Sequence, residues 1–267
     1  MIKIYLILFP KLVLLLMTFN VNAQNRNPEI EFYPMPSGYF IPNLSLIRPD
    51  IFVVPSKGGL FSPNKQQWIF KTNDTILSAE FSSISKSLLI TTIQNGYYEI
   101  LNSFHDSIHD RDTITPLLLT YNIIFNAKPS NFKKDMYYFI MGSDKYYLCS
   151  LFDKEIDTLF SADKMITDFK IIDTTTLLYC VQDKVMRYKL GEKPTIIFDA
   201  LNQNIYGLTG DKNNLYFSLD SGIVKINRDQ RSEYILGKGI KGKIQIFNNR
   251  IYVLDSDDRK LYSVALE

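Results

Sequence analysis

The sequence predicts an all-β fold, a six-bladed β-propeller in which six four-stranded sheets are arranged as a ring. Three observations lead to this prediction. A similar strand pattern recurs six times between residue 51 and the C-terminus, at intervals of 36 to 49 residues that average 40, as in stacked or radially arranged units. Each copy contains short apolar-aromatic strands separated by polar turns, and four such strands per unit are typical of propeller blades. No long segment has a 3.6-residue hydrophobic period, so we expect very little helix.

Each repeat is anchored on the first residue of its strongest strand. The six anchors are Ile51, Leu88, Tyr137, Leu178, Leu215 and Ile251. Alternation and turn residues divide each repeat into strands. The predicted strands are residues 44–47, 51–54, 59–61 and 67–70 in the first repeat, 76–81, 88–92 and 97–101 in the second, 121–126, 136–141, 146–152 and 157–160 in the third, 166–172, 177–182, 185–190 and 195–198 in the fourth, 205–209, 215–219, 223–227 and 233–236 in the fifth, and 243–247, 251–255 and 261–265 in the sixth.

Two repeats are irregular. The outer edge of the second is lengthened by an insertion at residues 103–113, and the sixth ends one strand short. Residues 29–33 alternate polar and apolar side chains and belong to no repeat of their own. Because an open sheet edge pairs readily with other chains, we expect residues 30–33 to form the outer strand of the last blade and to close the ring.

The first 23 residues are predicted to be a signal peptide, and residues 24–267 a single propeller domain. The leader contains an apolar run at residues 12–19 and small side chains at Val21 and Ala23, the positions that signal peptidase reads. The apolar stretch is shorter than the roughly 20 residues that span a bilayer; an uncleaved anchor is the alternative. We therefore expect an exported chain, periplasmic, cell-surface associated or secreted, with no transmembrane segment after cleavage.

The charge balance argues against a nucleic-acid partner. The chain has 30 Lys and Arg residues against 28 Asp and Glu residues. The leader contains Lys3 and Lys11 and no acid, so the remainder has no net charge. Binding to the phosphates of a nucleic acid needs a clear basic excess, and no run of like charges indicates a membrane-binding tail.

The two cysteines, Cys149 and Cys180, lie within predicted strands of neighbouring repeats. Facing sheets are about 10 Å apart, which exceeds the reach of a disulfide unless the two side chains meet directly. A chain of this length also buries its core without cross-links. We therefore expect two buried free thiols, with a disulfide as the alternative.

The fifth and sixth repeats resemble the repeats of six-bladed propellers of the NHL and TolB-like type. The resembling residues are Gly207 and Leu208, then Asn214, Leu215 and Tyr216, then Asp220, Ser221 and Gly222, with Asp183 and Asp255 in a similar place after Tyr179 and Tyr252. The resemblance covers nearly the whole chain after the leader but rests on residues that make the fold. It implies binding modules, envelope assembly partners, or metal-dependent hydrolases and lactonases, and fold alone does not choose among them.

Both histidines lie in the insertion, as His105 and His109, with Asp106 between them. Two His four residues apart with an acid between them resemble the zinc-protease helix motif. The surrounding sequence is typical of strand and loop, and no third ligand is identifiable. The insertion is therefore predicted to be an exposed polar loop.

Other local patterns have structural interpretations. Residues 255–258 lack the Gly and distal Glu of a calcium loop and are predicted to form a hairpin turn. Residues 236–243 lack the spacing of a phosphate loop and are predicted to be a basic connection. The single tryptophan, Trp68, is predicted to pack in an outer strand.

The inner strands contain polar residues near their ends, namely Glu80, Asn122, Asn126 and Asp168. In propeller lactonases, acids and amides from several inner strands hold a metal in the central channel. Whether these four residues converge does not follow from the sequence. No Ser-His-Asp arrangement is supported, so no catalytic residue, cofactor or metal ligand is assigned.

These observations favour an exported, non-catalytic, monomeric propeller that binds a protein or glycan partner through loops at one end of the ring. The alternative is a metal-dependent hydrolase or lactonase with its site in the central channel. A structural subunit of an envelope complex is a third possibility.

Overall fold

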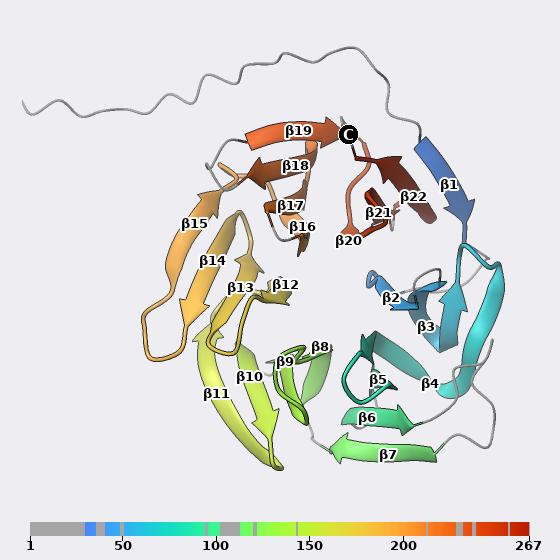
Figure 1. Cartoon of the computed structure of the whole chain (residues 1–267), viewed down its shortest axis with the longest axis vertical. Coiled ribbons are helices and arrows are strands. Elements are labelled where there is room, and N and C mark those ends of the chain that lie inside the picture. The colour runs from blue at the N-terminus through green and yellow to red at the C-terminus, as the bar shows by residue number, and fades with distance from the viewer. Residues whose placement is uncertain are drawn as a thin grey trace, which may run out of the picture.

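The computed structural model describes residues 30–35, 41–48, 51–93, 96–101, 113–119, 122–142, 144–211, 213–227, 232–236, 239–255 and 257–266. Within these ranges all regular elements are strands, and no helix that could cross a membrane is found. The strands form sheets arranged as a ring, with the N-terminal strand beside a C-terminal one (Figure 1). The predicted all-β class and low helix content are confirmed for the described residues. The predicted leader, residues 1–23, lies outside them.

Four of the sheets contain four antiparallel strands each. Within each sheet the strands follow one another from the centre of the ring to its rim (Figure 1). From the inner to the outer edge, these sheets consist of β8 (Ile123–Pro129), β9 (Met136–Gly142), β10 (Tyr146–Phe152) and β11 (Glu155–Ala162); β12 (Ile166–Ile171), β13 (Thr176–Val181), β14 (Lys184–Lys189) and β15 (Thr195–Asp199); β16 (Ile205–Gly210), β17 (Asn214–Leu219), β18 (Gly222–Asn227) and β19 (Ser232–Leu236); and β20 (Lys243–Phe247), β21 (Arg250–Asp255), β22 (Lys260–Ala265) and β1 (Ile30–Pro34). They correspond to the third, fourth, fifth and sixth repeats.

The first two repeats form one six-stranded sheet, so the prediction of six separate four-stranded blades is wrong: the described residues form a ring of five sheets. In order, the strands of this sheet are β2 (Ser45–Arg48), β3 (Ile51–Ser62), β4 (Gln67–Ser82), β5 (Ser87–Thr92), β6 (Gly96–Leu101) and β7 (Thr113–Leu118).

The difference arises at β3 and β4, because each contains two of the predicted strands. β4 pairs with β3 between Gln67 and Thr75 and with β5 between Ile76 and Ser82. Residues 71–75, which lie between two predicted strands, therefore remain within one hydrogen-bonded strand. The pairing of Thr75 with Lys57 of β3 keeps this segment in the sheet.

β1 closes the ring, as predicted. It pairs antiparallel with β22, from Ile30 opposite Val264 to Pro34 opposite Lys260. Side chains reinforce the contact, since Arg250 of β21 forms an ion pair with Glu31 of β1 (3.3 Å). The edge of the last sheet is therefore covered by the chain's own N-terminal strand.

The hydrophobic core is divided among the interfaces between neighbouring sheets. Tyr138 and Ile140 of β9 pack with Phe169 of β12 and Tyr179 of β13. Because each of these sheets lies between two others, both faces of its strands are buried, which explains the nearly continuous apolar runs. Full burial of one such side chain stabilises the fold by about 1.5–3 kcal/mol, so the interfaces supply the main driving force for forming the ring.

Both cysteines are buried and free, as predicted. Cys149 packs in the cluster between the second and third repeats, and Cys180 in the cluster between the fourth and fifth repeats. The two thiols thus belong to different interfaces.

Candidate functional site

In the inner strands of four repeats, the register of pairing with the following strand shifts at one point. The register shifts between Ile76 and Ser78 in β4, Ile124 and Asn126 in β8, Ile166 and Asp168 in β12, and Ile205 and Gly207 in β16. A bulge of this kind redirects the side chain that follows it. Residues two positions apart then share one face of a strand. The polar residues on this face are Ser78 and Glu80 on β4, Asn126 and Lys128 on β8, and Asp168 and Lys170 on β12.

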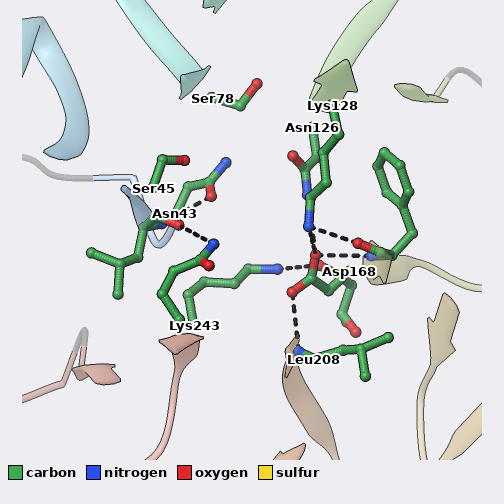
Figure 2. A network of polar contacts seen from close by, with 12 residues as sticks. Asn43, Ser45, Ser78, Asn126, Lys128, Asp168, Leu208 and Lys243 are labelled. Atoms are coloured by element: carbon green, nitrogen blue, oxygen red, sulfur yellow. Dashed lines mark hydrogen bonds and ion pairs between the residues drawn. The ribbon is translucent and has the colours of Figure 1, made fainter. Parts of the chain in front are cut away.

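Asp168 is the centre of the polar contacts between these strands (Figure 2). Its Oδ1 atom accepts hydrogen bonds from Nζ of Lys128 (2.9 Å) and from the amide N–H of Phe169 (2.8 Å), and Nδ2 of Asn126 lies 3.4 Å away. Its Oδ2 atom accepts a hydrogen bond from the amide N–H of Leu208 (3.1 Å). Both carboxylate oxygens are therefore occupied, by groups from β8, β12 and β16.

Asp168 and Lys128 form a buried ion pair. The two side chains are 5% and 18% exposed. Burial by itself would raise the pKa of Asp168, but the charges of Lys128 and Lys243 outweigh it and hold the pKa below its usual value. Burial would lower the pKa of Lys128, but Asp168 and Glu80 outweigh it and raise that pKa. Both partners are thus ionised at neutral pH.

Two more lysines lie in the same region, and each of them donates to a backbone carbonyl rather than to a carboxylate. Lys170 of β12 donates to the carbonyl of Gly210 (3.1 Å), and Lys243 of β20 donates to the carbonyl of Thr167. Burial, together with repulsion from Lys128, lowers the pKa of both ammonium groups. The ring centre therefore contains three ammonium groups, of which Asp168 neutralises one.

Glu80 is the second acid of this cluster, and it is only partly ionised at neutral pH. Burial raises its pKa to about 7, and the charge of Asp168 adds to this effect, whereas Lys128 and a hydrogen bond with Ser45 oppose it. The charge at the ring centre therefore becomes more positive as Glu80 takes up a proton.

Polar groups also connect successive repeats around the ring through hydrogen bonds to backbone groups. The bonds run from Asn43 Nδ2 to Leu77 O (3.4 Å), Ser45 Oγ to Ala79 O, Ala127 N to Ser78 Oγ (3.3 Å), Lys128 Nζ to Phe169 O (2.6 Å), Thr167 Oγ1 to Ile205 O (2.9 Å), Gly242 N to Ser218 Oγ (2.9 Å) and Gln245 Nε2 to Leu44 O (3.1 Å). Together they lead once around the ring. These bonds satisfy backbone groups that face the centre and hold the sheets in register.

Three of the four polar residues singled out from the sequence meet here. Glu80, Asn126 and Asp168 belong to the cluster, whereas Asn122 is exposed just before β8. Sequence reasoning missed the three lysines at positions 128, 170 and 243. The available signal was their spacing, since Lys128 follows Asn126 and Lys170 follows Asp168 by two residues in a strand.

Other sequence candidates do not join this cluster. His105, Asp106 and His109 lie outside the described residues. The carboxylate of Asp255 accepts the amide N–H groups of Asp257 (2.9 Å) and Asp258 (3.1 Å), which is the turn-forming role predicted for this segment. Trp68 packs edge-on against Phe61, with ring centroids 5.5 Å apart.

The charges at the ring centre match an anion better than a metal cation. A metal ligand needs free carboxylate oxygens, but those of Asp168 already accept bonds from an ammonium group and from backbone amides. The surrounding ammonium groups would also repel a divalent cation. Within the described ranges, no group of three or more His, Cys, Asp or Glu residues is placed to hold a metal.

Similar structures identify the architecture. The chain is similar to the WD40 β-propeller domain of Doa1 (TM-score 0.59, 9% identity, covering 90% of this chain and 98% of that one). The fold is a β-propeller. It is also similar to a chain of a nidogen/laminin complex (TM-score 0.61, 12% identity, 89% and 90% covered) and to the extracellular domain of a one-component system from B. thetaiotaomicron (TM-score 0.58, 13% identity, 90% and 42% covered).

No protein-family model matches the chain, and no curated protein matches it. At 9% to 13% identity the similar propellers establish the fold alone. The finer resemblance to NHL and TolB-like repeats stays a prediction.

Proposed function

We propose that this propeller is an exported, monomeric binding module without catalytic activity, which engages a protein partner through loops at one end of the ring. The observation that carries the proposal is a group of exposed apolar and aromatic side chains at that end, Ile84, Phe132 and Phe152. Their exposed fractions are 38%, 51% and 41%. Exposed aromatic side chains that gather in one place mark interaction surfaces.

The topology places these three residues at the same end. Strands alternate in direction across an antiparallel sheet, so the turn after an inner strand and the turn after the third strand lie on one side. Ile84 follows β4, Phe132 follows β8 and Phe152 ends β10. We call this side the Phe132 face. Leu201, in the connection from β15 to β16, lies at the opposite end.

Contacts between the loops make the Phe132 face continuous. Ser83 and Asn131 are hydrogen-bonded (3.4 Å), and a small crevice lies between their loops. The ammonium group of Lys133 lies 3.4 Å from the ring centroid of Phe152. A cation stacked on an exposed ring reduces the mobility of both side chains, and interface cores favour aromatic residues of limited mobility.

Two further observations support the proposal. The Asp168 carboxylate at the ring centre is engaged by Lys128 and by two backbone amides, which is a structural role. The similar propellers include a WD40 domain, a class of interaction module, and an extracellular domain, which agrees with the predicted leader.

Site-specific photo-cross-linking tests the proposed surface. Benzoylphenylalanine replaces Phe132 in one version of the full chain and Leu201 in another, and both are irradiated in the cells that export the protein. We expect a protease-sensitive adduct from position 132 and none from position 201. With the partner so identified, Phe152→Ser is expected to weaken binding by about 30-fold, as for a side chain worth about 2 kcal/mol at a binding hot spot.

Leu201→Ser is the matched control, because Leu201 is 73% exposed and lies at the other end. It is expected to leave the affinity unchanged. An adduct that forms only from position 201 would contradict the proposal, and an adduct that is degraded by glycosidases rather than proteases would replace the protein partner with a glycan.

A further inference from the structure

We propose that the centre of the ring binds a phosphate group between Lys128 and Lys243, with the Oδ1 atom of Asn126 accepting a hydrogen bond from a phosphate O–H. The proposal is independent of the Phe132 face. It rests on the unequal numbers of cations and anions at the ring centre, on an unpartnered buried acceptor, and on the access of solvent to the lysines.

The cluster contains more positive than negative charge. Lys128 is paired with Asp168 (2.9 Å), whereas Lys170 and Lys243, among the described residues, each donate to a single backbone carbonyl. An ammonium group carries three donors, so donors remain for a ligand. Glu80 is the other acid near Lys128.

Asn126 supplies the second observation. The residue is 5% exposed, and its Nδ2 atom is directed to Asp168 (3.4 Å), but its Oδ1 atom has no hydrogen-bond partner. Figure 2 shows this oxygen turned away from Asp168, toward the side on which Ser78 lies. A buried acceptor without a donor is costly, and a protonated oxyanion supplies both the negative charge and the missing donor.

Solvent reaches this region. The side chain of Lys128 is 18% exposed, and Glu80, Lys170 and Lys243 are half-buried, although all four project from inner strands. A hydrated anion therefore has access to the ammonium groups from the ring centre.

Calorimetric titration of the full chain with inorganic phosphate and with sulfate at pH 6.5 tests the site. Sulfate has the same shape but no O–H at this pH, so phosphate is expected to bind about tenfold more tightly, as for one hydrogen bond to a charged group. Asn126→Ala is expected to remove the difference between the two anions. Glycerol 3-phosphate, titrated in parallel, distinguishes a phosphate ester from free phosphate as the preferred form.

Lys243→Met removes one ammonium group and is expected to weaken the binding of both anions at least tenfold. Lys189→Met is the control, because Lys189 is exposed and paired with Glu192 (2.7 Å) at the surface. Thermal unfolding without ligand shows whether each variant is folded. No heat of binding with 10 mM phosphate, or equal weakening by Lys189→Met, would overturn the proposal.

The pH dependence gives an independent readout with sulfate, which does not titrate. Glu80, with a pKa of about 7, faces Lys128, Asp168 and Ser45. As pH rises from 6 to 8 it becomes negatively charged beside the site, so sulfate affinity is expected to fall. Lys170 and Lys243, whose pKa values are lowered, act in the same direction at higher pH. Glu80→Gln is expected to flatten the profile between pH 6 and 8; an unchanged profile would place the anion elsewhere.

Discussion

The Asp168 carboxylate shows how a single residue joins three sheets. It accepts bonds from β8, from its own strand and from β16, so its ionised form is favoured despite burial. Because the pKa is lowered on folding, this contribution to stability is present above the unfolded-state pKa of an aspartate. It is lost as the pH falls through the lower native value.

Asp168→Asn is expected to lower the free energy of unfolding by about 3–5 kcal/mol, because it leaves Lys128 buried without its counter-charge. The double variant Asp168→Asn with Lys128→Met is expected to lose less than the sum of the single changes. Urea unfolding of the two single variants and the double variant measures both quantities.

The exposed pair Lys145 and Asp163 (3.0 Å) is the matched comparison. Removing it by Asp163→Asn should lower the free energy of unfolding much less than Asp168→Asn, because solvent screens the exposed pair. If Asp168→Asn cost no more than this surface change, the ion pair at the ring centre would not hold the sheets together.

At the residue scale the sequence identified the acids and amides of the cluster and missed its lysines. Lysine is almost never buried without a partner, and the partner here, Asp168, lies forty residues away on another sheet. The bulges that direct Asn126 and Asp168 to the ring centre leave no residue pattern that separates them from regular strand, so the convergence required the structure.

At the scale of elements, strands bounded by strong turns were predicted most accurately. The predicted limits of β10 and β20 are those observed, and β16, β17 and β18 differ from prediction by one residue. Two differences between the predicted and the observed strands arise from hydrogen-bonded pairing with a neighbouring strand, which the residue types do not indicate. β8 extends to Pro129 because Lys128 pairs with Tyr138, and β7, which follows the insertion, was not predicted.

Gly242 lies directly before β20, at the end of the connection from β19, and its surroundings leave no room for a side chain. Its φ is +149°, a side chain there would overlap the carbonyl of Leu254, and its N–H donates to Ser218 Oγ (2.9 Å). Gly242→Ala is expected to destabilise the protein by more than about 2 kcal/mol, because the clash adds to the left-handed backbone cost of about 1–2 kcal/mol. Thermal unfolding measures the change.

Gly239→Ala provides the control for this backbone cost. Gly239 has a φ of +103°, but nothing lies within 4 Å of the position of an added Cβ. Its substitution should cost about 1–2 kcal/mol. Equal losses for the two variants would show that the close approach to Leu254 has no consequence.

At the scale of the whole molecule, the stability of the ring depends on β1. Without this strand, β22 would present unpaired N–H and C=O groups along a sheet edge. Removing residues 1–34 is therefore expected to lower the midpoint of urea unfolding and to produce dimers or larger species. Light scattering after size-exclusion chromatography detects them.

The matched control is a truncated chain that lacks residues 1–29 and retains β1. It is expected to remain monomeric and as stable as the full chain. A monomer of unchanged stability after removal of residues 1–34 would show that closure by β1 is dispensable.

The closure by β1 also fixes an order of events in time. Ile30 and Val264 are paired although they lie 234 residues apart in the chain. At a synthesis rate of about 5–20 residues per second, the first strand waits roughly 10–50 seconds for its partner. Contacts this distant in sequence form slowly. A chain whose first strand has no partner until its last strand exists remains unclosed throughout its synthesis.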